Sequence, residues 1–330
     1  MYKPTKRCRT RLFGAGQRVP SVILYKDRQI RDVKNFCFAG ANGSVLAVDK
    51  TYNLGAIYCT VTVYKNTAVL RCRSGDHPVF AGPLILHGHS DMETYSFFFG
   101  HLASRLADAT YQFGHVTIGT DEEAALIKAI MCAFPSVKHI SCSRHLKENT
   151  ARKLDSLLGS PDPKYRDVQA RLFGDDGLVS NADTVGFEAA VDTFWSESLH
   201  TAPPAFQQYF DTQLLTLLQD NVAAGRAGWT NNNCESFNHV LKQSIQWCPQ
   251  HLPELTEKLR QVVCAQFSEA ERALLGLGHL MLDSSHVRHR LTPEVWQRMS
   301  LQQRQHVSNK CFRLQPLHVS TSTDSVLRSP

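Results

Sequence analysis

The chain has 330 residues, of which 42% are hydrophobic and 20% are charged. This composition suits one large folded domain or two small ones, and it excludes a highly charged, disordered polypeptide. No run of about 18 apolar residues occurs, so we expect no membrane-spanning helix. The ten cysteines include no Cys-x-x-Cys pair, which argues against a disulfide scaffold or a zinc ribbon and favours a reducing compartment.

The net charge of +6 is unevenly distributed along the chain. Residues 1–34 hold ten Lys and Arg against two Asp, and residues 286–330 hold seven against two acids. The body between these ends is therefore acidic. Basic ends on an acidic body suit a polyanionic partner, although the solvated ends of an ordinary enzyme explain the charge equally well.

The N-terminal region, residues 1–43, is predicted to be a basic arm or a truncated end, because its first 20 residues are polar, basic and interrupted by Gly and Pro. Three runs rich in β-formers follow, at Ser44–Val48, Ile57–Tyr64 and Val79–His87. Their close spacing predicts three antiparallel strands.

Hydrophobic periodicity then alternates between helix and strand. Helices are predicted at Glu93–Leu106, Glu122–Cys132 and Leu146–Leu158, with strands at His115–Gly119 and Val137–Ser141. Three hairpin strands followed by alternating β and α units predict an α/β fold, with helices packed on a mixed sheet. Residues 44–160 form the first part of this domain.

No strand pattern occurs in residues 161–228, which we interpret as a helical insertion. Trp195 and Trp229 are expected to be core aromatics and not base-stacking residues. Residues 229–285 are predicted to be helical, with helices at Cys234–Gln246 and Leu252–Glu271. Residues 286–330 are predicted to be a basic, partly disordered tail.

Three acids stand at the ends of predicted elements. Asp49 and Asp121 follow short hydrophobic strands, and Glu235 lies in the first turn of a predicted helix. A single Asp after a strand is more often a turn residue or a helix cap. If the three acids meet, however, their carboxylates suit Mg²⁺, and a two-metal site of this kind acts on phosphodiesters.

The segment Cys142-Ser-Arg-His145 follows the strand Val137–Ser141. A zinc site needs four ligands and no second pair is evident, so a structural role is favoured. A papain-like cysteine hydrolase is a more distant alternative, because the catalytic Cys and His of such enzymes are far apart in sequence, whereas two residues separate Cys142 from His145.

Four blocks of the sequence resemble, in order, the motifs of Mutator-like (MULE) transposases. They are Val48-Asp-Lys-Thr-Tyr52, Gly119-Thr-Asp121, Cys142-x-x-His145 with Asn149 after it, and Thr230-Asn-Asn-x-x-Glu235-Ser-x-Asn238. The resemblance runs from about Ser44 to Gln246. It implies an RNase H-like fold with a DDE triad of acids and a helical insertion before the Glu.

The resemblance also implies roles for individual residues. The catalytic and metal-binding acids would be Asp49, Asp121 and Glu235. Site-supporting residues would be Cys142, His145, Asn149, Asn231, Asn232 and Asn238. Candidate phosphate contacts are Lys50, Arg144 and Lys147, although ordinary surface charge is the commoner role of such residues.

The activity implied is transposition by DNA strand cleavage and strand transfer with Mg²⁺, for which Mn²⁺ would substitute. The partners implied are transposon ends, target DNA and further copies of the chain, with no membrane. The implied location is the nucleus, for which Lys6-Arg7-x-Arg9-x-Arg11 is at best a weak import signal. Two alternatives stay open: a host-retained, catalytically silent module that binds DNA or protein, and an RNase H-like nuclease without strand transfer. Metal binding that depends on each acid would favour an enzyme over a silent module.

Overall fold

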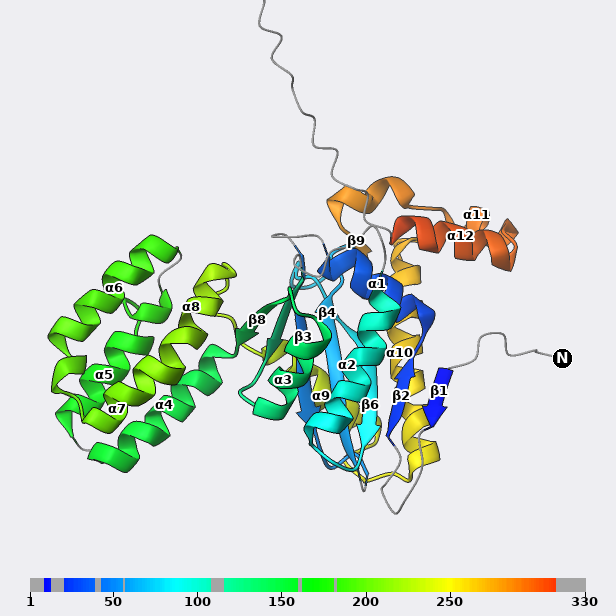
Figure 1. Cartoon of the computed structure of the whole chain (residues 1–330). Helices are drawn as coiled ribbons and strands as arrows, with labels where there is room; N and C mark the ends of the chain where they lie inside the picture. Colours follow the sequence, from blue (N-terminus) through cyan, green and yellow to red (C-terminus); the bar gives the residue numbers. More distant parts are fainter. Residues whose placement is uncertain are drawn as a thin grey trace, which may run out of the picture.

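The computed structural model describes residues 9–12, 21–38, 43–55, 57–107, 116–159, 162–180 and 183–312. Within these residues, seven strands form one mixed sheet in the order β1-β2-β6-β4-β3-β7-β8 (Figure 1). The strands are β1 (Arg9–Leu12), β2 (Val22–Tyr25), β3 (Leu46–Thr51), β4 (Tyr58–Lys65), β6 (Val79–His87), β7 (Thr117–Thr120) and β8 (Lys138–Ser141). A separate antiparallel pair joins β5 (Val69–Arg71) to β9 (Leu280–Leu282).

The centre of the sheet combines two pairing modes. Strands β3, β4 and β6 pair antiparallel, whereas β7 and β8 run parallel to β3. A short loop joins β3 to β4, and the segment from β4 to β6 contains β5. Each parallel strand is reached through a helix, as parallel pairing requires. The mixed α/β sheet expected from the sequence is therefore confirmed.

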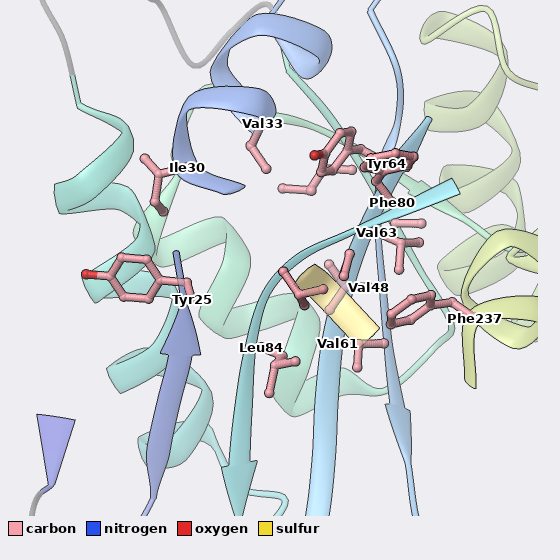
Figure 2. Packing of buried hydrophobic residues seen from close by; sticks show 14 of the residues in the cluster. Tyr25, Ile30, Val33, Val48, Val61, Val63, Tyr64, Phe80, Leu84 and Phe237 are labelled. Atoms are coloured by element: carbon pink, nitrogen blue, oxygen red, sulfur yellow. The ribbon is translucent and has the colours of Figure 1, made fainter. Parts of the chain in front are cut away.

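Helices cover both faces of the sheet (Figure 1). On one face lie α1 (Asp27–Cys37), α2 (Met92–Leu106) and α3 (Ala124–Ala133), and on the other α9 (Asn232–Ser244) and α10 (Leu252–Ala273). Each helix buries one stripe of apolar side chains, which in α10 recurs at four-residue spacing from Leu255 to Phe267. Figure 2 shows part of this core, where Phe237 of α9 approaches the strands that carry Val48 and Val61.

A helical unit with its own hydrophobic core lies beyond β8 (Figure 1). It contains α4 (Ser143–Leu158), α5 (Pro163–Phe173), η3 (Leu178–Ser180), α6 (Thr184–Glu197), η4 (Leu199–Thr201), α7 (Pro204–Tyr209), the π-helical turn η5 (Phe210–Leu214) and α8 (Leu215–Ala223). Asn221 of α8 joins this unit to the sheet, because its side chain donates to the carbonyl of Ser141 and accepts from the Ser141 amide, both at 2.8 Å.

The chain after α10 folds back near α1. Beyond β9 come η6 (Ser284–His289), α11 (Pro293–Arg298) and α12 (Leu301–Cys311). Phe312 is buried, its carbonyl accepts a hydrogen bond from Asn35 at 2.9 Å, and the Arg28 guanidinium lies 5.1 Å from its ring centroid. No helix in the described part of the chain combines the length and apolar character that crossing a membrane requires.

The structure corrects the predictions at both ends of the chain. Residues 22–38, expected in a basic arm, form β2 and α1 and belong to the main core. Residues 301–311, expected in a partly disordered tail, form α12. Within the basic N-terminal cluster, Arg9 and Arg11 belong to β1, whereas Lys6 and Arg7 lie outside the described residues, as do the last 18 residues of the chain. The expected absence of strands from 161–228 is confirmed for the described part, although the helical unit already begins with α4.

Candidate active site

Strand register brings Asp49 and Asp121 level with each other. Strands β3 and β7 are parallel neighbours, and Ala47 is paired with Gly119. Asp49 lies two residues after Ala47, and Asp121 lies two residues after Gly119, on neighbouring strands about 4.8 Å apart. The expected position of Asp49 after its strand is wrong, because β3 continues to Thr51 and Asp49 pairs with Val61 of β4.

Burial acts on both carboxyl groups, and the charge of Asp121 acts in addition on Asp49. Burial, and next the charge of Asp121, raise the pKa of Asp49 from 3.8 to about 7. Two hydrogen bonds oppose this shift: the Lys50 amide donates to Oδ1 at 2.9 Å and Asn238 Nδ2 donates to Oδ2 at 2.7 Å. Burial likewise raises the pKa of Asp121.

Glu235 is held by Arg144 and not by the two aspartates. It lies in the first turn of α9, as predicted, and accepts hydrogen bonds on both carboxylate oxygens from the Arg144 guanidinium, one of them at 2.8 Å. Asn238 follows one turn later on the same helix face and reaches Asp49. The structure thus brings Asp49 and Asp121 together, with Glu235 nearby on the helix that contacts them.

The acid pair fits a hard cation. The Oδ1 atoms of Asp121 and Asn238 are buried and have no hydrogen-bond partner, an arrangement that costs free energy unless a ligand compensates it. These oxygens, with the Asp49 carboxylate, are the donor type that Mg²⁺ prefers. No group of three or more His, Cys, Asp and Glu side chains is arranged as a metal site within the described residues, which agrees with Glu235 being held by Arg144.

Cys142 and His145 lie at the start of α4, close to the acid pair. Cys142 is fully buried, and its Sγ accepts a hydrogen bond from the Asn231 amide at 3.3 Å. Asn231 in turn donates from Nδ2 to the Val48 carbonyl at 3.4 Å, which ties the start of α9 to β3. The Nδ1 atom of His145 is buried without a hydrogen-bond partner. Burial raises the pKa of Asp121, and the charge of His145 opposes part of that rise.

The remaining predicted residues lie around the acid pair in different environments. Asn149 donates to Glu122 at 2.6 Å, and the Lys50 ammonium pairs with Glu123 at 2.9 Å. Lys147 and Asn232 are exposed. Because it pairs with Glu123, the Lys50 ammonium lies next to an acid that is two residues from Asp121.

The two tryptophans predicted to be core residues each pack against a hydrophobic core. Trp229 packs against the main core and Trp195 against the core of the helical unit, as predicted. A Cβ on Gly119 would lie 2.3 Å from the Trp229 ring, so glycine is required for this contact. Asn231 is the N-cap residue of α9, but its side chain makes no capping hydrogen bond.

Several site residues were not identified from the sequence. Glu123 accepts a hydrogen bond from Tyr95 at 2.8 Å, and Thr120 is 2.8 Å from the ring of His139. Burial lowers the pKa of His139 to about 4, so the ring is neutral at physiological pH. In the sequence, the run of three acids from 121 to 123 could have identified Glu123 as a residue near the site.

No family profile matches the chain, and no curated protein matches its sequence at a significant level. The arrangement of the acids and the resemblance of the motifs are therefore the observations that bear on function. Two level carboxylates with unpartnered oxygens beside them can hold a divalent cation at the surface of the sheet.

Proposed function

We propose that this chain is a metal-dependent DNA-cleaving and strand-transferring domain of the MULE type. The observation that carries the proposal is the level, electrostatically coupled pair of Asp49 and Asp121 on neighbouring parallel strands. The strand order β6-β4-β3-β7-β8 supports it, because three antiparallel strands are followed by two parallel ones as the RNase H-like resemblance leads one to expect. The helical unit between Asp121 and Glu235 supports it further.

The chain's own residues would hold and orient the metal ligands. Asp49 and Asp121 would bind Mg²⁺, or Mn²⁺ in its place, and the amide of Asn238 keeps the Asp49 carboxylate in one orientation. Bound Mg²⁺ would neutralise the acid pair and stabilise charge that develops at a phosphodiester. Glu235 would become a ligand by leaving Arg144, whose guanidinium would then be available to a phosphate oxygen.

The proposal includes the other expectations from the resemblance. Its substrates are transposon ends and target DNA, its working form is a homo-oligomer, and its location is the nucleus. The test is nicking of supercoiled plasmid with Mg²⁺ or Mn²⁺, together with joining of an oligonucleotide 3′ end to the plasmid. Asp49→Asn, Asp121→Asn and Glu235→Gln should each abolish both reactions.

The matched control for this experiment is Asp192→Asn, because Asp192 is an exposed acid on α6 away from the acid pair. It should leave nicking and joining unchanged. Nicking that persists in Asp49→Asn at the wild-type rate would refute the assignment of the acid pair. Nicking without joining would instead indicate a hydrolytic nuclease.

A second candidate is a catalytically silent module that binds DNA or protein. The ion pair between Glu235 and Arg144 favours it, because this pairing occupies the third acid. Such a module would bind its partner in EDTA, and the three acid substitutions would leave that binding unchanged.

A further inference from the structure

Three exposed aromatic side chains lie on segments next to β3 and α9. Tyr52, Tyr58 and Trp247 are 57%, 38% and 58% exposed, and they are the aromatic members of the exposed large hydrophobic side chains in the described part of the chain. Tyr52 lies three residues after Asp49. Tyr58 begins β4 one residue before the Cys59–Thr51 pair. Exposed apolar side chains scattered singly are normal, whereas rings that lie close together indicate a binding surface.

A basic or imidazole side chain accompanies each ring. The Lys242 ammonium lies 5.2 Å from the centroid of Tyr52, and that of Lys50 lies 5.5 Å from the centroid of Tyr58. The ring of His239 meets that of Trp247 edge-on at 5.4 Å. Both His239 and Lys242 belong to α9, and Lys242 follows Asn238 by one helical turn. The same helix thus contacts the acid pair and contributes to this surface.

Backbone contacts hold the two aromatic loops together. The Gln250 amide donates to the Leu54 carbonyl at 2.8 Å, and Gly55 forms a β-bridge with Gln250. A Cβ on Gly55 would lie 2.6 Å from the Gln250 carbonyl oxygen, so the close approach requires glycine. The loop that follows β3 and carries Tyr52 is therefore joined to the loop that follows α9 and carries Trp247.

The backbone at these loops is strained. Asn53, Gln246 and Trp247 have φ values of 64°, 54° and 59°, in the left-handed region that non-glycine residues rarely adopt. The Trp247 amide donates to the Lys242 carbonyl at 2.9 Å, which holds this turn in place. Strain of this kind persists where the surrounding structure enforces it and is concentrated at functional sites.

We propose that Tyr52 and Trp247, both held next to the C-terminal part of α9, form a stacking surface for a single-stranded segment of nucleic acid that extends from the acid pair. Tyr58 lies apart from them, against His87, which meets Tyr95 of α2. Exposed aromatic rings interspersed with cations are what proteins use to bind single strands without sequence preference, because every base has a π-face and every phosphate a negative charge. The inference deepens the proposed function and rests on it for the identity of the substrate. It assigns to this surface the unpaired strand next to the cleaved bond, and not the duplex.

The experiment measures binding of the whole chain to a fluorescently labelled oligo-dT and to a duplex of the same length, by anisotropy in EDTA. Tyr52→Ala and Trp247→Ala should each weaken oligo-dT binding by about 10-fold and duplex binding much less. Tyr52→Phe, which keeps the ring, should stay close to wild type. Val185→Ala, at a 79% exposed position on α6, is the matched control and should change nothing.

Each outcome decides the inference. Wild-type affinity of both alanine variants for oligo-dT, equal losses in the Phe and Ala variants of Tyr52, or no binding of oligo-dT by the wild type would overturn it. If this surface binds a protein partner instead, the wild type will show no binding of oligo-dT. Because binding is measured without metal, the surface is tested separately from cleavage: ring-dependent binding without nicking would retain the surface and refute the catalytic proposal.

Discussion

Replacing Asp49 by Asn should stabilise the metal-free protein at neutral and higher pH. Burial and the Asp121 charge raise the pKa of Asp49 from 3.8 to about 7. A carboxyl group with a raised pKa in the folded state binds its proton more tightly there than in the unfolded chain. Its contribution to stability is therefore fully present below pH 3.8 and is lost as the pH rises towards 7.

The size of this effect follows from the shift. Each unit of pKa difference corresponds to about 1.4 kcal/mol, so the wild type should lose about 3 kcal/mol relative to Asp49→Asn between about pH 5 and about pH 8. Asn cannot ionise, and its side-chain oxygen can still accept from the Lys50 amide. Mg²⁺ at about 100 times its dissociation constant should return about 3 kcal/mol to the wild type and nothing to the variant.

Urea unfolding in EDTA and in Mg²⁺, across this pH range, measures both effects. Asp192→Asn serves as the control, because this acid is exposed, and it should follow the wild type at every pH. Parallel pH profiles for the wild type and Asp49→Asn would refute the reasoning, since they would mean that Asp49 is neither desolvated nor repelled by Asp121. A Mg²⁺ response that survives in Asp49→Asn would refute its role as a ligand.

Three further substitutions test other parts of the structure. Arg144→Gln should change the free energy of unfolding by no more than about 1 kcal/mol, because the ion pair of Arg144 with Glu235 is partly exposed. The same substitution should increase the Mg²⁺-induced thermal shift, because it frees Glu235; a smaller shift would contradict this. Asn221→Ala should cost about 2–4 kcal/mol in urea unfolding, since two buried hydrogen bonds to β8 are lost, and a cost near zero would mean that the helical unit is not joined to the sheet there. Gly119→Ala should cost about 1–3 kcal/mol through its clash with Trp229, and Trp229→Leu should recover part of this loss in a double-mutant cycle; additive losses would exclude the contact.

Local pattern was sufficient for most elements of the central sheet. The strand predicted at Val79–His87 has the same bounds in the structure, and the helix predicted at Glu93–Leu106 begins one residue earlier, at Met92. These segments combine a clear period with matching residue types, so local and tertiary preferences agree. The N-terminal region misled the prediction, because its basic residues dominate the composition while Ile30, Val33 and Phe36 form the buried stripe of α1.

The site was predictable only in part. Asp121 after a short strand and Glu235 at the start of a helix could be located from their neighbours alone. The pairing of Glu235 with Arg144 could not, because 91 residues separate the two and no local pattern encodes the distance between α4 and α9. The exposure of Trp247 is a similar case, since an aromatic side chain in sequence reads as a core residue.

By itself, the sequence determined the order and kind of the main elements and the chemistry available at their ends, because hydrophobic period and residue type act over a few neighbouring residues. Only the tertiary structure decided which side chains meet. Register between β3 and β7 brought Asp49 level with Asp121, and the packing of α9 brought Asn238 to Asp49 and left Glu235 with Arg144. Those distances depend on contacts between residues far apart in the chain, whose free energies are settled only when the whole core has packed.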